Sequence, residues 1–277
     1  MNHSLITNIQ RMCFADGPGL RTTVFMKGCT IHCPWCSNPE NISFNKESYF
    51  IKSKCVINSD SGKECKKCKY NVGLCTATGE YGYYKPIDEL VEEIKKDKEF
   101  FSSSGGGVTF SGGEALIHAD YILSAMIKLK EENISIGLET ALFVPLENIK
   151  KIIKYIDFFY IDVKILEKNM CMKVLGGDIE LYYGNLEYIL KYAKNVIFRV
   201  PCNDEYTLSK ENMEIMLPFF KDNSTVPIEI FKTHNLAKSK YDSLSKVAMG
   251  VKCTDNVFCD FYYHLTKQGN TVERKEI

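Results

Sequence analysis

Arginine is scarce in this sequence: only four of its 35 basic residues are arginines, and 35 acidic residues balance the charge. Arginine is the side chain most used to recognise phosphates and bases, and a balanced charge creates no field that attracts polyanions. We therefore expect no nucleic-acid partner. No apolar run is long enough to cross a bilayer, and residues 1–11 lack the apolar core of a signal peptide. The expectation is a cytoplasmic protein without membrane contact.

Cysteine, in contrast, is abundant, with 12 residues in a chain of 277. In a reducing compartment such cysteines are metal ligands or buried thiols more often than disulfide partners. Cys29, Cys33 and Cys36 follow an apolar strand-like run at 22–26, with the spacing C-x3-C-x2-C. Four cysteines close a [4Fe–4S] cluster, whereas three leave one iron with an open position, which is typical of catalytic sites. The alternatives are structural thiols or a zinc site that borrows His32.

Two short motifs frame these cysteines. Asp16-Gly17-Pro18-Gly19-Leu20-Arg21 precedes them, Ser37-Asn38-Pro39-Glu40 follows them, and the aromatic Trp35 stands before the last cysteine. The set resembles the radical S-adenosylmethionine (SAM) superfamily and, within it, the glycyl-radical-enzyme activating enzymes of the pyruvate formate-lyase activating type. The resemblance covers the chain from about residue 5 to the C-terminus.

This resemblance implies a reaction and its cofactors. Cys29, Cys33 and Cys36 would hold a catalytic [4Fe–4S] cluster, and SAM would chelate its open iron beside Trp35. Reductive cleavage of SAM then yields a 5′-deoxyadenosyl radical, which removes a hydrogen from the α-carbon of a glycine in a partner glycyl-radical enzyme. The expected reductant is a flavodoxin or a ferredoxin, and the expected oligomeric state is a monomer.

After Pro86, short apolar strands alternate with amphipathic helices, which predicts a parallel sheet with right-handed crossovers. The fold class is α/β, a partial (β/α)6 TIM-type barrel, as the resemblance also implies. A lead-in strand is expected over 1–12 and a last edge strand over 271–277. The six expected barrel strands are 22–26, 108–110, 134–139, 158–163, 196–200 and 228–231. The clearest expected helices are 121–131, 186–193, 209–220, 238–247 and 254–269, and 102–107 is expected to be a flexible loop.

Residues 44–84 have no sustained period and interrupt the barrel, which comprises 1–43 and 85–277. This stretch carries four cysteines spaced C-x9-C-x2-C-x6-C, namely Cys55, Cys65, Cys68 and Cys75. The spacing resembles the ferredoxin-like inserts of many activating enzymes and implies a second [4Fe–4S] cluster. Its gaps are longer than usual, and Thr76 replaces the expected proline. A closed zinc knuckle is the alternative, because four thiolates also make one.

Further candidate residues follow the barrel strands, where function collects in such folds. By the resemblance, Gly112, Gly113 and Glu114 meet the methionyl amino group of SAM. Lys164 meets its carboxylate, and His234 lies near the adenosine. Glu139 and Asp162 form an acidic pair that also holds a monovalent cation. Alternatively, Asp162 and Lys164 simply pair with each other, since they point to the same side of a strand.

The turn Asp16-Gly17-Pro18-Gly19 is expected to line the mouth of the active site, where the partner's glycine loop passes. Two other function classes stay open. One is a radical SAM enzyme that acts directly on a peptide or a small molecule, because its cofactor machinery looks the same. The other is a non-catalytic iron–sulfur or zinc binding module, which has no use for Gly112-Gly113-Glu114 or for Asp162-x-Lys164.

Overall fold

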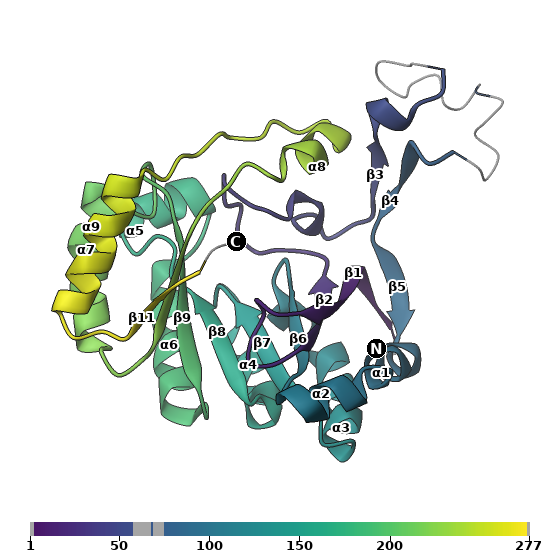
Figure 1. The fold of residues 1–277 in the computed structure, drawn as a ribbon, viewed down its shortest axis with the longest axis horizontal. Coiled ribbons are helices and arrows are strands. Elements are labelled where there is room, and N and C mark those ends of the chain that lie inside the picture. Colours follow the sequence, from purple (N-terminus) through teal and green to yellow (C-terminus); the bar gives the residue numbers. More distant parts are fainter. Residues whose placement is uncertain (1–2, 58–67, 69–74, 276–277) are drawn as a thin grey trace.

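A sheet of nine strands runs through the part of the chain that the computed structural model describes, residues 3–57, 68 and 75–275 (Figure 1). Its order is β11-β10-β9-β8-β7-β6-β2-β1-β5. Neighbours from β2 to β10 pair in parallel, which confirms the predicted parallel sheet. These six strands are β2 (Arg21–Met26), β6 (Gly107–Gly112), β7 (Ser135–Thr140), β8 (Phe158–Asp162), β9 (Val196–Cys202) and β10 (Ile228–Lys232).

Three edge strands extend the partial barrel. The predicted lead-in strand is β1 (His3–Cys13), which pairs antiparallel with β2, and β5 (Tyr83–Pro86) pairs antiparallel with β1. The predicted last strand is β11 (Val272–Arg274), which pairs in parallel with β10. The barrel wall therefore ends at β5 on one side and at β11 on the other.

Helices follow most of the parallel strands and cover the outside of the sheet (Figure 1). In α3, for example, the buried residues recur with helical spacing at Ile122, Met126 and Leu129, and they face the sheet. The α-helices are α1 (Ile87–Lys95), α2 (Lys98–Ser104), α3 (Ala119–Glu131), α4 (Leu146–Ile152), α5 (Lys168–Met170), α6 (Ile179–Tyr192), α7 (Lys210–Asp222), α8 (Lys238–Ser243) and α9 (Asp255–Lys267). Shorter helical turns are η1 (Pro39–Asn41), η2 (Lys52–Lys54), η4 (Ala115–His118), η5 (Ile153–Tyr155) and the π-type η6 (Cys171–Leu175).

The hydrophobic core lies between the sheet and these helices. Val24, Val108, Ile136 and Ile161 are fully buried on the central strands. Each such side chain contributes about 1.5–3 kcal/mol when it leaves water. The inside of the barrel is more polar, since Arg21, Thr23, Thr109 and Glu229 are also buried. The apolar core thus stabilises the sheet and its helices, and the polar side chains lie inside the barrel.

Three predicted bounds were wrong. Ser102–Ser104 belong to α2 and not to a loop, because their hydroxyls bond back to the carbonyls of Lys98 and Phe100. Gly105, with φ of 71°, then ends that helix in the left-handed conformation. Helix α6 begins at Ile179 instead of 186, since the Asp178 carboxylate caps it by accepting from the Glu180 N–H. Helix α8 ends at Ser243 instead of 247.

The described part of the insert is more regular than the sequence indicated. Strands β3 (Glu47–Phe50) and β4 (Thr78–Tyr81) pair antiparallel in a separate two-stranded sheet. Cys55 and Cys75 leave the same end of this hairpin, and Cys68 is also described. Cys65, the remaining expected ligand, lies outside the described residues. Among the residues in view, no helix combines the length and the apolarity needed to span a membrane.

Candidate functional site

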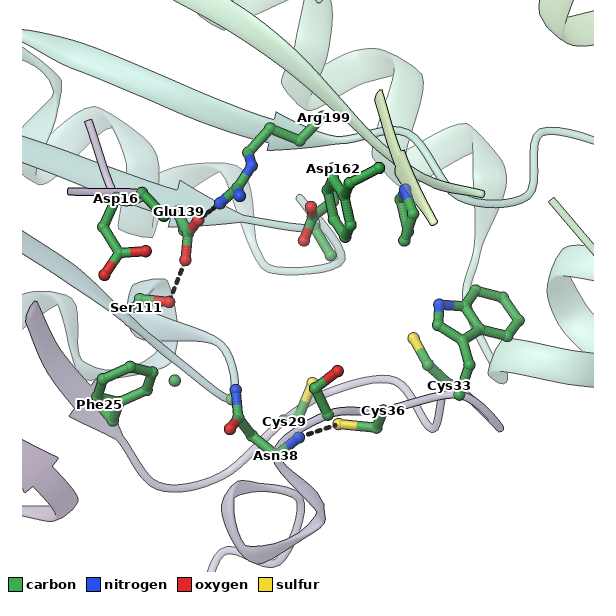
Figure 2. A pocket seen from close by; sticks show the side chains of 18 of the residues that line it. Asp16, Phe25, Cys29, Cys33, Cys36, Asn38, Ser111, Glu139, Asp162 and Arg199 are labelled. Carbon is green, nitrogen blue, oxygen red and sulfur yellow. Dashed lines mark hydrogen bonds and ion pairs between the residues drawn. The ribbon is translucent and has the colours of Figure 1, made fainter. Parts of the chain in front are cut away.

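A cavity of about 630 Å³ opens at the carboxyl ends of the parallel strands. A volume of this size suits a drug-sized ligand or cofactor. Figure 2 shows that residues from distant parts of the chain face each other across it. The three motif cysteines Cys29, Cys33 and Cys36 lie on one wall, and the opposite wall carries Asp16, Ser111, Glu139, Asp162 and Arg199. The fold therefore brings the cysteine loop and the strand-end residues to one site.

The cysteine loop starts directly after β2. Gly28 takes φ of 110°, and its N–H donates to Asn41 O at 2.8 Å, so the chain leaves the strand sharply. The Cys36 N–H donates to Cys33 O at 3.1 Å, which closes a tight turn between these two ligand candidates. Burial raises the pKa of Cys29 to about 12 and also raises the pKa values of the Cys33 and Cys36 thiols. Burial thus disfavours the bare thiolates, and a bound metal would favour them.

The arrangement fits a cluster better than a single zinc ion. A zinc site needs all its ligands about 2–2.3 Å from one ion. Such a site also needs a fourth ligand beside the three thiolates. His32 is exposed and lines another cavity, with Phe44 and Lys246, so it is not the borrowed ligand. A cubane offers each thiolate its own iron, and three cysteines around one cavity match that requirement.

Gly112 and Gly113 line the cavity beside this loop. A Cβ on Gly112 would lie 2.3 Å from the Met26 nitrogen, and one on Gly113 would lie 2.1 Å from the Gly28 oxygen. Only glycine therefore lets the end of β6 lie against β2 and the cysteine loop. The same lack of side chains leaves backbone open to a ligand, as the sequence predicted.

Glu114, the third residue of this motif, forms hydrogen bonds within the protein. Its carboxylate accepts from the N–H groups of Leu116 and Ala141 and from the Thr140 hydroxyl, at 3.0–3.1 Å. The side chain is buried and does not line the cavity. Burial raises the pKa of Glu114 to about 7. These bonds join the end of β6 to the end of β7.

Asp162 and Lys164 both line the cavity, and they form the pair that the alternative interpretation anticipated. The Lys164 Nζ lies 2.5 Å from Asp162 Oδ2. Burial opposes the charge on Lys164, but the Asp162 carboxylate and the neighbouring Cys33 and Cys29 sulfurs together hold the pKa of Lys164 above its usual value. The lysine therefore remains an ammonium group at the wall of the cavity, where it can also meet an anion.

Glu139 lines the cavity and has partners that the sequence did not reveal. It accepts hydrogen bonds from the Ser111 hydroxyl and from the Arg199 guanidinium. The guanidinium carbon of Arg199 lies 4.8 Å from the Tyr160 ring centre and 5.1 Å from that of Phe231. Arg199 thus neutralises the carboxylate that was expected to bind a cation. Its signal in the sequence was a rare arginine inside an apolar strand.

The expected substrate turn reaches the cavity only through Asp16, whose carboxylate accepts from the Thr23 hydroxyl at 2.5 Å. Gly17, Pro18 and Gly19 do not line it. A Cβ on Gly17 would lie 2.3 Å from the Phe158 ring, and one on Gly19 would lie 2.4 Å from the Gly106 nitrogen. The glycines are therefore packed near the starts of β8 and β6, which corrects the expected position of the turn.

Residues just before this turn lie at the cavity mouth instead, namely Met12, Cys13, Phe14 and Ala15. The side chain of Phe14 is 80% exposed, so the mouth carries an apolar group that has little cover of its own. His234 and Trp35 also line the cavity, as predicted, and the Trp35 ring stacks on that of Tyr206 at 5.4 Å.

Comparison with known proteins identifies related chains. Residues 23–217 match the model of the radical SAM superfamily. The chain is 34% identical to the pyruvate formate-lyase 2-activating enzyme of Escherichia coli (strain K12), covering 87% of this chain and 81% of that protein. It is 29% identical to the trans-4-hydroxy-L-proline dehydratase activating enzyme of Clostridioides difficile, covering 87% and 88%. Coproporphyrinogen III oxidase from Escherichia coli shares the fold, with a TM-score of 0.55 at 13% identity over 89% of this chain and 52% of that chain.

Proposed function

This chain belongs to the radical SAM superfamily, and from that premise we propose that Cys29, Cys33 and Cys36 hold the catalytic [4Fe–4S] cluster of a glycyl-radical-enzyme activating enzyme. Family membership makes the chain an enzyme, which removes the non-catalytic binding module as an alternative. The observation that carries the proposal is the single cavity that these three thiols share with the polar strand ends. Relatives named as activating enzymes, which match most of the chain, support the class of substrate.

Bound at this site, the cluster would supply the single electron for reductive cleavage of SAM. The protein's own residues orient and enclose these groups. Lys164, kept charged by Asp162, is placed to bind the methionyl carboxylate. The backbone at Gly112 and Gly113 permits close approach to the amino group, and Trp35 and His234 border the remaining space.

Apolar residues on the cavity wall exclude water and other hydrogen donors from the reacting groups. Phe25, Ile31 and Phe231 line the cavity between its polar groups. Glu139 and Asp162 remain the proposed ligands of a monovalent cation, which must compete with Arg199 and Lys164 for these carboxylates. The partner's glycine loop is proposed to enter past Asp16, beside Phe14.

The decisive experiment is electron paramagnetic resonance on reduced enzyme mixed with SAM and a glycyl-radical enzyme, chosen from a neighbouring gene. A glycine-centred radical is expected. Asp16→Ala should lower the yield of this radical far more than it lowers uncoupled SAM cleavage, because Asp16 lines the cavity and is not among the proposed cofactor ligands. Asp16→Asn, which keeps the shape of the side chain, is the matched variant.

The other outcome assigns the enzyme to the remaining rival class. If no neighbouring glycyl-radical enzyme is activated, and deuterium from a labelled peptide or metabolite appears in 5′-deoxyadenosine, the substrate is that molecule and not a partner enzyme.

We further propose that residues 44–84 form an insert domain on the barrel of 1–43 and 85–277, and that Cys55, Cys65, Cys68 and Cys75 bind an auxiliary [4Fe–4S] cluster. Hydrogen bonds from the backbone at Ala77 and Thr78 lower the pKa of Cys75, which favours a ligating thiolate. Cys55 and Cys75 also flank one end of the β3–β4 hairpin, which supports a shared ligand set.

Iron content tests this second cluster. Anaerobically reconstituted protein should carry about eight irons, twice the complement of one cubane. The triple variant Cys29→Ala, Cys33→Ala, Cys36→Ala should keep about half of that iron, since the four insert cysteines are untouched. One zinc ion together with a single cluster's iron would instead identify the insert as a zinc knuckle.

The electron is proposed to come from a flavodoxin or a ferredoxin, and the enzyme is proposed to act as a monomer in the cytoplasm. Every described cysteine is a free thiol, which suits a reducing compartment.

A further inference from the structure

The segment that follows the third cysteine is held in place by a helix about 200 residues further along the chain. The Lys240 Nζ, on α8, lies 2.6 Å from Glu40 Oε1, 2.9 Å from Asn38 Oδ1 and 3.3 Å from Ser37 O. The neighbouring Tyr241 hydroxyl donates to the carbonyl oxygen of Cys36 itself at 3.1 Å. In Figure 1, α8 lies next to the chain that follows β2. We name Lys240 and Tyr241 the α8 clamp.

The α8 clamp is well protected from solvent. Tyr241 and Glu40 are each only 8% exposed, and Lys240 is half-buried. Hydrogen bonds and ion pairs in such surroundings are stronger than those at an open surface. Asn38, whose side chain accepts from Lys240, also contacts the cysteine sulfur: its N–H donates to Cys36 Sγ at 3.4 Å. Fixing Asn38 therefore also fixes a donor to the ligand atom.

The same region connects to the insert. Lys246 Nζ lies 2.7 Å from Glu47 Oε1, and the fully buried Lys27 contacts Glu47 Oε2 at 3.0 Å and the carbonyl of Glu40. Glu47 is the first residue of β3, so the base of the insert hairpin and residues 36–40 share one ionic network. The network gives Cys36 a rigid support that the short loop could not supply alone.

From these contacts we infer that Lys240 and Tyr241 are positioning residues of the catalytic cluster: they fix the backbone of Cys36, and the Lys240–Glu40 pair tunes the cluster's reduction potential. The inference rests on the proposed cluster at Cys29, Cys33 and Cys36. Groups around the ligands govern both metal retention and potential. Because reduction adds negative charge to the cluster, a nearby cation favours the reduced form and a nearby anion opposes it.

Two single variants test the electrostatic part. Lys240→Met removes a cation and leaves Glu40 unpaired, so the midpoint potential should fall. Glu40→Gln removes the anion and leaves Lys240, so the potential should rise, and the double variant should lie near the wild-type value. The midpoint potential is measured by anaerobic redox titration, followed by electron paramagnetic resonance. The signal of the catalytic cluster is identified as the one that changes when SAM is added. Lys238→Met, an exposed position on the same helix, is the matched control.

Tyr241→Phe tests the anchoring part, because it removes only the hydroxyl that donates to Cys36 O. Loss of the catalytic cluster's iron to a chelator should become on the order of 10-fold faster. The control Tyr192→Phe alters a ring that is 53% exposed and should lose iron at the wild-type rate.

The inference is overturned if the midpoint potential shifts in the same direction in Lys240→Met and Glu40→Gln, or does not shift. It is also overturned if Tyr241→Phe loses iron at the wild-type rate. A purely structural role predicts shifts of the same sign, since both variants break the same contact. The proposed function fails separately, if wild-type enzyme shows no cluster signal that responds to SAM.

Discussion

The Cys33→Ala protein is expected to make no 5′-deoxyadenosine from SAM, while its barrel still folds. Cys29, Cys33 and Cys36 line one cavity and are the proposed ligands of the catalytic cluster. With two thiolates the cluster has lost a protein ligand, and SAM loses the iron that it chelates. The fold should survive because the sheet and its helices form a core of their own, to which Cys33 adds only contacts at the edge.

The measurement is 5′-deoxyadenosine formation by anaerobically reconstituted, dithionite-reduced enzyme, with circular dichroism to verify folding. Cys29→Ala and Cys36→Ala should behave in the same way. Cys259→Ala is the control, because Cys259 is an exposed thiol on α9, far along the chain from the cluster motif, and full activity is expected. Continued 5′-deoxyadenosine production by the folded Cys33→Ala protein would defeat the ligand assignment.

Replacing Lys164 by methionine should weaken SAM binding by tens-fold to thousands-fold, since truncating one partner of a buried charge pair costs about 2–5 kcal/mol. Lys164 is the proposed partner of the methionyl carboxylate, and only 13% of its side chain is exposed. The affinity can be measured anaerobically by equilibrium dialysis with labelled SAM. Lys168→Met, at a side chain that is 70% exposed on α5, should bind normally.

A double variant separates the two roles of Lys164. If the lysine serves only to neutralise Asp162, then Lys164→Met combined with Asp162→Asn removes both charges and restores affinity for SAM. If the lysine binds the carboxylate of SAM, the double variant stays as weak as the single one. Recovery of affinity would therefore refute the proposed contact and favour the simple ion pair.

The local sequence pattern predicted most of the strands and helices of the barrel. The six barrel strands could be located because short apolar runs alternate with amphipathic helices, and each of these signals lies within one segment. The loop of Cys29, Cys33 and Cys36 could be recognised for the same reason, since its ligands lie within eight residues of one another. Strand-end positions then indicated which further residues reach the cavity.

Side-chain direction was less predictable. Glu114 stands next to two glycines that line the cavity, yet its carboxylate turns into the protein to accept from Ala141 and Thr140 on β7 and its following loop. Similarly, Gly17 packs against Phe158 of β8, and Gly19 packs against the end of α2 and Gly106, away from the mouth. In each case the deciding partner is distant in sequence, and a motif does not show which hydrogen bonds its side chains satisfy first.

The sequence by itself determined the chemistry available to this protein, because three closely spaced cysteines after a strand can only present their sulfurs from one loop. It also determined that the chain would form a parallel sheet, since alternation of apolar and helical segments is a local property. Only the tertiary structure decided how the charges are shared. Arg199 on β9 pairs with Glu139 on β7, two strands away in the sheet. Lys240 on α8 pairs with Glu40, 200 residues earlier in the chain. Such pairs depend on where whole strands and helices pack, and burial of the common core contributes far more to that packing than any one charge pair does.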